Sequence, residues 1–288
     1  MYVIKLLKSY HIWRVATAIF PYLSGKISWT EVVMTRVIVA GTTGWVGKPL
    51  AEAVEAAEDL ELVGAVSRSA RGQTIGKVTI AGSVAEALAT PADVLVDYTS
   101  AAAVRKHVLA AVRAGVHVVV GSSGLSEDDF REIDAAAKET GVGVVAVGNF
   151  AISAALLQRF AVEAAKHFPV WEIIDSAYAG KIDAPSGTAR ELAWRMAEVR
   201  KPELAVPIDK TVGQREARGA DTSGVRVHSL RLPGYTIGVE VRFGLPDERL
   251  TLHYDGGSGA APYISGTLLA IRRVHEFRGV VRGMDRLL

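Results

Sequence analysis

The sequence predicts an α/β protein in which a doubly wound parallel sheet is followed by a second domain with an open mixed α+β sheet. Three observations favour this fold class. Short strands rich in Val alternate with helical segments through the first half of the chain. A glycine-rich turn joins the first strand to the first helix, and segments of alternating apolar and polar residues lie between 225 and 254.

Composition limits the possible classes of function. The chain has 288 residues, enough for two modest domains. It has no Cys, which excludes a disulfide framework, a thiolate metal site and a Cys nucleophile. This fits a reducing compartment, so we expect a cytoplasmic protein without a bound metal. The net charge is +2, and the excess of basic residues falls in 1–33, so we expect no nucleic-acid partner.

Residues 1–33 differ in character from the rest of the chain and form an N-terminal extension of uncertain role. The uncharged run Val15–Gly25 is too short for a membrane span of about 20 residues. Arg14, Pro21 and the lack of an A-x-A site disfavour a signal peptide. We interpret the segment as an appendage ahead of a natural start at Met34, with no membrane partner. A targeting or membrane role and a structural arm are the alternatives.

The first strand, 37–40, leads into the turn GTTGWVG at 41–47 and then a helix from Lys48. Gly41 permits the tight turn, Gly44 lets the backbone approach a pyrophosphate, and Gly47 lets the helix pack near the strand. The helix N-terminus attracts phosphate. This order predicts a Rossmann-type dinucleotide-binding domain over 34–150. A tight strand-to-helix turn without a ligand is the alternative.

The end of the second strand, 60–66, indicates which dinucleotide is bound. An acidic residue at this position holds the ribose diol of NAD. Here the segment 67–71 reads SRSAR and contains no acid. Since Arg binds a 2′-phosphate that a carboxylate would repel, we expect NADPH, with NADH possible. A solvated basic loop is the alternative.

Further strands are predicted at 94–98, 116–120 and 143–147, each followed by a helix or turn. The carboxyl ends of parallel strands meet at one sheet edge, where ligands bind. The predicted cofactor site is therefore Gly41, Thr43, Gly44, Trp45, Val46, Gly47, Ser67, Arg68, Tyr98, Thr99, Gly121, Ser122, Ser123, Gly124, Gly148, Asn149 and Phe150.

The second half begins with a predicted helix at 153–167 and a strand at 171–175. A further helix starts near Thr188, so Ser186 and Gly187 lie at its N-terminus, with Lys181 upstream. This arrangement predicts a second anion site, sized for a carboxylate. A plain Pro-Ser cap is the alternative.

The rest of the chain is predicted as a long loop, 201–224, antiparallel strands at 225–232, 238–243 and 249–254, and a closing helix, 263–274. The closing helix is expected to return to the first domain.

Four motifs resemble those of the dihydrodipicolinate reductases, which are NAD(P)H-dependent enzymes of lysine and diaminopimelate biosynthesis. They are GTTGWVG, GSSG at 121–124, GNF at 148–150 and KIDAPSGTA at 181–189, in the family's order. The resemblance implies hydride transfer to a cyclic unsaturated imino acid carboxylate. It implies a substrate-binding and tetramerisation domain at 151–263, a homotetramer, and a first domain completed by about 264–288. It also places Gly121–Gly124 and Asn149–Ala151 near the nicotinamide, and assigns substrate binding to Lys181, Ser186, Gly187 and Thr188.

The chain departs from the family at the substrate. The family pattern E-x-H-H-x-x-K, whose first His donates a proton, corresponds to 175–181, where Ala177 and Tyr178 replace both His. The family's G-E-H becomes Ile-Gly-Val at 237–239, and its Ser-Arg becomes Ser258-Gly259. Tyr178, with Lys181 nearby, is a candidate catalytic acid. Packing, another substrate contact for Tyr178, and water as the donor are alternatives.

Three hypotheses about function are compatible with these residues. In the first, the chain is a reductase of this family that acts on dihydrodipicolinate with a different proton donor. In the second, it is a divergent NADPH-dependent imine or enamine reductase related to amine dehydrogenases. In the third, it is a non-catalytic homologue that binds NADP(H). The retained anion site argues against the third hypothesis.

Overall fold

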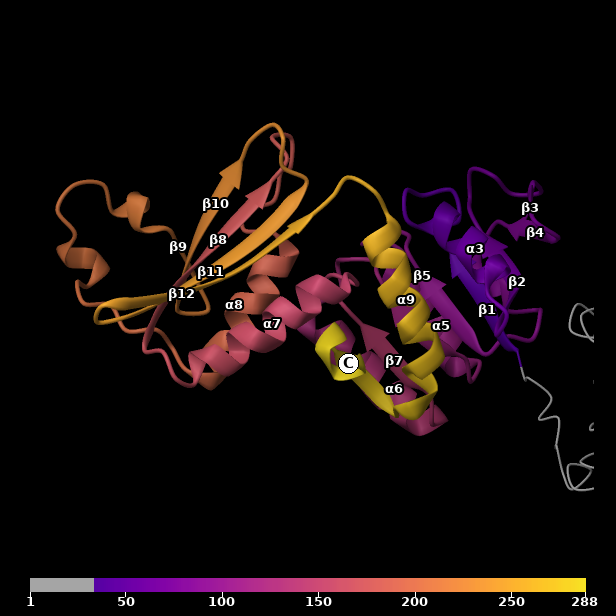
Figure 1. The fold of residues 1–288 in the computed structure, drawn as a ribbon. Coiled ribbons are helices and arrows are strands. Elements are labelled where there is room, and N and C mark those ends of the chain that lie inside the picture. The colour runs from indigo at the N-terminus through magenta and orange to yellow at the C-terminus, as the bar shows by residue number, and fades with distance from the viewer. Residues whose placement is uncertain (1–33) are drawn as a thin grey trace, which may run out of the picture. The chain divides into compact units, whose positions relative to one another are not determined.

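The computed structural model describes residues 34–288, and the predictions for 1–33 lie outside the described residues. Within 34–288 the chain forms an eight-stranded sheet and a five-stranded sheet (Figure 1). None of the helices in this part of the chain combines the length and the apolar character that a membrane crossing needs.

The first sheet has the strand order β13-β7-β6-β5-β1-β2-β4-β3. Its parallel centre is β1 (Thr35–Ala40), β2 (Leu60–Val66), β5 (Val94–Asp97), β6 (His117–Val120) and β7 (Gly143–Ala146). The predicted doubly wound parallel sheet is confirmed. Three short strands were not predicted: β3 (Thr74–Ile75), β4 (Val78–Ala81) and β13 (Gly279–Arg282). Strand β3, with two residues, is too short to show a period.

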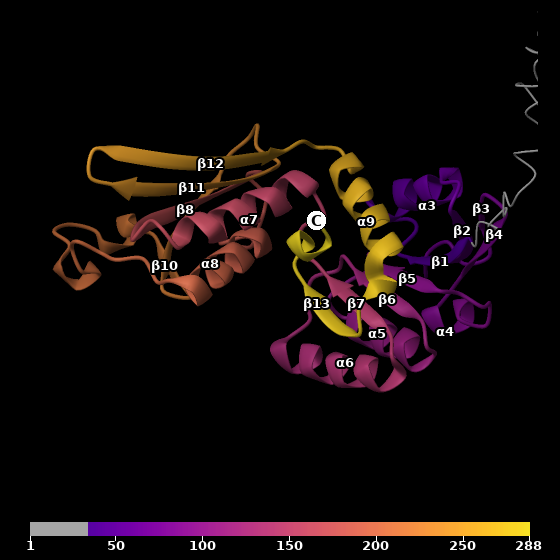
Figure 2. The ribbon, with the colours of Figure 1, turned by 60° about the horizontal axis from the view of Figure 1, so that its bottom comes forward.

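Helices cover both faces of the first sheet (Figure 2). One face packs against α3 (Gly47–Ala56), α9 (Ala261–Arg273) and the turns η3 (Val274–Glu276) and η4 (Met284–Leu287). The other packs against α4 (Val84–Ala87), α5 (Val104–Arg113) and α6 (Glu127–Thr140). Helix α9 follows the second sheet in the chain yet contributes Ala270 and Ile271 to the core of the first.

The second sheet has the order β12-β11-β8-β10-β9. Its strands are β8 (Val170–Ala177), β9 (Ala220–Thr222), β10 (Val225–Arg231), β11 (Ile237–Leu245) and β12 (Glu248–Gly256). The sheet is mixed, as predicted, but β10 was wrongly expected to run antiparallel. It pairs in parallel with β8, which separates it from β11. Alternation in the sequence indicates which side chains share a face and not which strands are neighbours.

The segment 201–224 is also more regular than the predicted loop. It contains η1 (Ile208–Lys210), η2 (Arg215–Arg218) and β9. Strand β9 pairs with β10 over three residues and thereby forms one edge of the second sheet.

Only one face of the second sheet is covered by helices of residues 34–288. Helices α7 (Ile152–Ala165) and α8 (Gly187–Val199) pack there around Trp171, Ile173 and Phe243 (Figure 2). The opposite face carries an open groove of about 490 Å³, with Ile174, Leu230 and Arg242 among its lining residues. Leu230 is 41% exposed.

Candidate active site

The glycine turn has the backbone geometry that a phosphate site requires. Gly41 has φ +92°, and a Cβ there would overlap the carbonyl of Tyr98. A Cβ on Gly47 would overlap the carbonyl of Gly41, so the start of α3 approaches the end of β1 closely. The N-cap residue of α3, Val46, makes no side-chain hydrogen bond to the helix. Within α3 the N–H of Lys48 donates to the carbonyl of Gly44 and Pro49 has no N–H, so the N–H that the helix start keeps for an anion is that of Gly47.

A cavity of about 800 Å³ extends from this turn to the loop after β2. Thr43 Oγ1 lies 2.9 Å from Ser67 Oγ, so hydroxyl groups connect the two loops. Arg68 is exposed beside them and makes no ion pair with any residue of 34–288. The predicted cofactor residues that line this cavity are Gly41, Thr43, Gly44, Ser67, Arg68, Tyr98 and Thr99.

Asp97, fully buried at the end of β5, holds two of the predicted cofactor loops together. Its Oδ1 accepts hydrogen bonds from Thr99 Oγ1 (2.8 Å) and Ser122 Oγ (2.6 Å), and its Oδ2 lies 2.8 Å from His107 Nδ1. Burial opposes ionisation, but the hydrogen bonds from His107, Ser122 and Thr99 outweigh it and lower the pKa of Asp97. Sequence reasoning missed Asp97 and His107. The sequence feature that could have identified Asp97 is its position as the acidic last residue of the otherwise apolar strand VLVD.

A second cavity, of about 440 Å³, lies between the two sheets. It brings the loop Gly121–Gly124 and Gly148 opposite Gly187 at the start of α8. Its remaining lining residues are Val120, Leu125, Glu127, Phe130, Ala146, Val147, Arg190, Glu191, Trp194, Thr222, Ser223 and Arg282. We call this cavity the inter-sheet cleft. It joins loops predicted to lie beside the nicotinamide with a segment predicted to bind substrate.

The predicted carboxylate site begins at the N-cap of α8. Ser186 Oγ accepts a hydrogen bond from the N–H of Ala189 at 3.2 Å, so this hydroxyl caps the helix. Lys181 Nζ lies 2.7 Å from Asp183 Oδ1 in the same loop. Burial raises the pKa of Asp183, but the ammonium of Lys181 outweighs this effect, so the carboxyl pKa lies below its ordinary value.

A buried ion pair anchors this loop to β8. Asp175 Oδ2 accepts hydrogen bonds from Arg231 Nη2 (2.8 Å), the N–H of Ser186 (2.8 Å) and Ser229 Oγ (3.1 Å). Arg231 Nη2 also donates to the carbonyl of Asp183 at 2.6 Å. Burial opposes ionisation of Asp175, yet the hydrogen bonds from Ser186 and Arg231 keep its pKa low. Sequence reasoning missed this pair, although an acid within the apolar strand WEIID was a signal.

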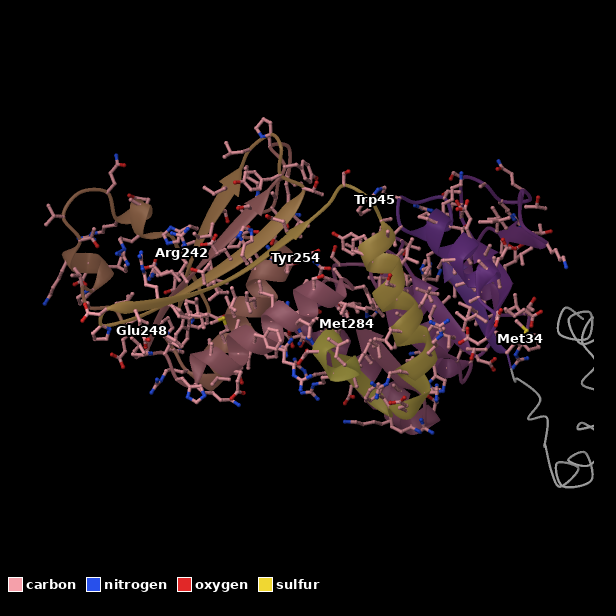
Figure 3. All side chains as sticks on the ribbon, in the orientation of Figure 1. Met34, Trp45, Arg242, Glu248, Tyr254 and Met284 are labelled. Atoms are coloured by element: carbon pink, nitrogen blue, oxygen red, sulfur yellow. The ribbon has the colours of Figure 1, made fainter. Side chains whose placement is uncertain are left out.

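The remaining predicted residues line neither cavity: Trp45, Val46, Gly47, Asn149, Phe150, Tyr178, Lys181, Ser186 and Thr188. Trp45 is 57% exposed (Figure 3), and the centre of its ring lies 5.5 Å from that of Tyr263 in an edge-to-face arrangement. Phe150 is buried in the core of the first sheet. Tyr178 is 52% exposed, whereas Ala177 is fully buried, so of the two replaced His positions only that of Tyr178 reaches solvent.

Curated relatives match most of the chain. A reductase named 4-hydroxy-tetrahydrodipicolinate reductase from Desulfitobacterium hafniense is 38% identical over 263 residues, which cover 88% of this chain and 98% of the relative. The enzyme of the same name from Moorella thermoacetica is 38% identical over 266 residues, with coverage of 88% and 97%.

Solved structures agree with these relatives. The dipicolinate-bound dihydrodipicolinate reductase from Paenisporosarcina sp. TG-14 aligns with a TM-score of 0.77 and 30% identity, covering 88% of this chain and 100% of that one. An amine dehydrogenase from Mycobacterium smegmatis aligns at 16% identity with a TM-score of 0.60, over 88% of this chain and 95% of that one, which shows a shared fold alone. The family described as dihydrodipicolinate reductase matches with its N-terminal part at residues 35–150 and its C-terminal part at 153–288, and the chain belongs to this family.

Proposed function

We propose that the chain is an NADPH-preferring reductase that transfers a hydride to a cyclic unsaturated imino acid carboxylate, as the names of its relatives suggest. The observation that carries the proposal is the inter-sheet cleft, where the loop Gly121–Gly124 faces the start of α8. Hydride transfer requires that the two reactants be held close together and aligned, and a cleft lined by both the cofactor loop and the substrate segment supports this function.

The test is a steady-state assay of NADPH oxidation with freshly prepared dihydrodipicolinate beside a panel of cyclic imino acids. Turnover of dihydrodipicolinate above all other substrates supports the proposal. Preference for another imino acid supports the second candidate, a divergent imine reductase. The observation favouring the second candidate is the loss of both His, with Ala177 buried and unable to exchange a proton.

The residues of the first cavity fit a dinucleotide with a 2′-phosphate. When bound, the reduced nicotinamide supplies the hydride. The glycine turn and the start of α3 would hold the pyrophosphate. Arg68, Ser67 and Ser69 would hold the 2′-phosphate, since Ser67 Oγ lies 3.2 Å from Ser69 Oγ and all three residues line the cavity. Asp97 would keep Thr99 in place at the first cavity and Ser122 in place at the inter-sheet cleft.

Arg68→Ala is expected to weaken NADPH binding by roughly 1–3 kcal/mol, with a smaller effect on NADH, because a charged hydrogen bond to the phosphate is lost. Isothermal titration calorimetry with both cofactors measures the difference. Arg71→Ala is the matched control, since Arg71 pairs with Glu86 at 3.4 Å and does not line the cavity. Equal losses of affinity for NADPH and NADH in Arg68→Ala would show that this arginine does not bind the 2′-phosphate.

The open face of the second sheet leads us to expect a homotetramer. Exposed apolar side chains such as Leu230 and Val170, each 41% exposed, border the groove on that face. Burying such a face against another copy removes apolar surface from water. Light scattering is expected to give the mass of four chains, and Leu230→Glu to give a smaller species. A wild-type monomer at micromolar concentration would contradict this expectation.

A further inference from the structure

The inter-sheet cleft contains few groups that can supply a proton. Its charged side chains are Glu127, Arg190, Glu191 and Arg282, and no His, Lys or Tyr of residues 34–288 lines it. Reduction of a C=N or conjugated C=C bond needs a proton as well as a hydride. Tyr178, the candidate acid from the sequence, does not line the cleft. The two glutamates are therefore the acids to compare.

Glu127 is paired with Arg282 at the exposed side of the cleft. Arg282 Nη1 donates to both carboxylate oxygens of Glu127, at 2.9 and 3.0 Å. The same guanidinium lies 4.3 Å from the ring centre of Phe130 and 5.2 Å from that of Trp194, which fixes its position. The Glu127 side chain is 70% exposed and both of its carboxyl oxygens are engaged by Arg282, so this group faces solvent and a fixed arginine.

Glu191 differs from Glu127 in its surroundings. Glu191 is half-buried and makes no ion pair with the residues of 34–288. The nearby Arg195 is already engaged, since it donates to Gln158 Oε1 at 2.9 Å and to Asp285 Oδ2 at 2.5 Å. Glu191 thus has a carboxyl group that is partly shielded from water and is not ion-paired with a residue of 34–288.

Glu191 lies between the segment predicted to bind substrate and the loop predicted to border the nicotinamide. It lies four residues after Gly187 on α8, so the two residues share a helix face one turn apart. At its other end, Glu191 Oε2 lies against Gly148, where a Cβ would overlap the carboxyl oxygen. Gly148 follows β7 and precedes Asn149, in the loop predicted to border the nicotinamide. The carboxyl group therefore spans from the substrate segment to the cofactor loop.

The charges around Glu191 leave its proton bound more firmly than usual. Burial raises the pKa of Glu191 above its ordinary value. Arg195 on the same helix, Arg282 on β13 and the N–H of Gly148 lower the pKa in part, and Asp285 in η4 raises it. Glu127 of α6 is paired with Arg282. Arg190 also lines the cleft, but its Nη1 donates to the carbonyl of Pro185 at 2.7 Å.

We propose that Glu191 is the proton donor of the reductase reaction, in place of the family's missing histidine. The assignment rests on the proposed function. The carbon of the substrate's C=N or conjugated C=C bond receives the hydride that the cofactor supplies. The π bond breaks, and its electron pair takes the proton from the Glu191 carboxyl group. The resulting carboxylate regains a proton from water.

The test is Glu191→Gln, which keeps the size of the side chain and removes the acid. We expect kcat/KM to fall by about 10²–10⁴-fold on the best substrate of the imino acid panel, as for other lost general acids. The Kd values of NADPH and of dipicolinate, measured by calorimetry, are expected to stay unchanged. Wild-type kcat is expected to decline as pH rises through the pKa of Glu191, and the residual rate of the variant to lack this decline.

A second readout does not depend on turnover. Carbon-13 NMR of the cofactor-free protein labelled at the glutamate side-chain carboxyl is expected to show one resonance that titrates above the ordinary glutamate range. This resonance is expected to be absent from Glu191→Gln and present in Glu198→Gln, a control on the exposed face of the same helix. Glu191→Asp, which keeps the acid, is expected to recover part of the lost activity.

The outcomes separate the two proposals. If the wild type reduces none of the panel, the proposed function fails. If the wild type is active and Glu191→Gln stays within about threefold of it, another group supplies the proton and the assignment alone fails. Tyr178→Phe identifies that group: a large loss in this variant, together with an active Glu191→Gln, would transfer the role to Tyr178.

Discussion

Asp175→Asn is expected to lower the free energy of unfolding by about 3–5 kcal/mol, because it leaves a charged group without its partner in a buried site. Asp175 is fully buried, and the Arg231 side chain is 15% exposed. An asparagine keeps the shape of the side chain, but it cannot neutralise the guanidinium. Its amide oxygen can still face the three donors at the Oδ2 position, from Arg231, Ser186 and Ser229, but its N–H₂ group then lies at the buried Oδ1 position, which has no hydrogen-bond partner.

Urea unfolding at fixed protein concentration measures this effect, since subunit association would otherwise shift the apparent stability. Asp59→Asn is the matched control. Asp59 forms a two-bond pair with Arg272, but both side chains are more than 40% exposed, so a loss of about 0–1 kcal/mol is expected. Asp175→Asn/Arg231→Met is expected to recover part of the loss by removing the unpaired charge. Equal stability of the two single variants would show that the buried pair contributes no more than a surface pair.

The low pKa of Asp175 makes the same pair dependent on pH. A carboxyl whose pKa is lower in the folded state stabilises the protein above its unfolded value, and this contribution is lost as pH falls through the folded value. The wild type is therefore expected to lose stability as pH falls below about 4. The free energy of unfolding of Asp175→Asn, measured by urea unfolding across pH, is expected to fall less steeply as pH decreases. Identical slopes would mean that other carboxyls, such as Asp97, dominate acid unfolding.

Local patterns were sufficient to predict the cofactor half of the molecule. The order of strand, glycine turn and helix at 37–57 depends on neighbours in the sequence, and the structure shows the same order with Gly41 at positive φ. The strand ends that carry Thr99 and Ser122 were predicted for the same reason. Their link through Asp97 was missed, because a hydrogen bond between residues 25 apart leaves no periodic signal.

The substrate half depends on contacts that are remote in the sequence. The parallel pairing of β10 with β8 joins segments about fifty residues apart, and it places Arg231 beside Asp175. Glu191 was passed over because a glutamate on an amphipathic helix is normally solvated. Only the approach of α8 to Gly148 and β13 gives this carboxyl group its half-buried environment. Side-chain chemistry at the junction of the two sheets is thus a property of their packing.

Lys181→Met is expected to reduce kcat/KM by about 10²–10⁴-fold while leaving NADPH affinity unchanged. Two effects combine. The substrate carboxylate loses a charged hydrogen bond, which contributes about 1.5–3 kcal/mol. In addition, Asp183 loses the ammonium that now lies 2.7 Å from its Oδ1, and the unpaired carboxylate then repels the substrate. Methionine preserves the apolar stem of the lysine, so packing of the loop is expected to survive.

Lys181→Met/Asp183→Asn separates the two effects, because it removes the repulsion without restoring the attraction. The double variant is expected to be more active than Lys181→Met and less active than the wild type. Lys181 is expected to bind the substrate carboxylate equally well in the ground state and the transition state. Loss of such an interaction raises KM, so we expect most of the fall in kcat/KM to come from a higher KM. A single variant within about fivefold of the wild type would place the substrate carboxylate away from Lys181, with Arg190 of the inter-sheet cleft as the next cation to test.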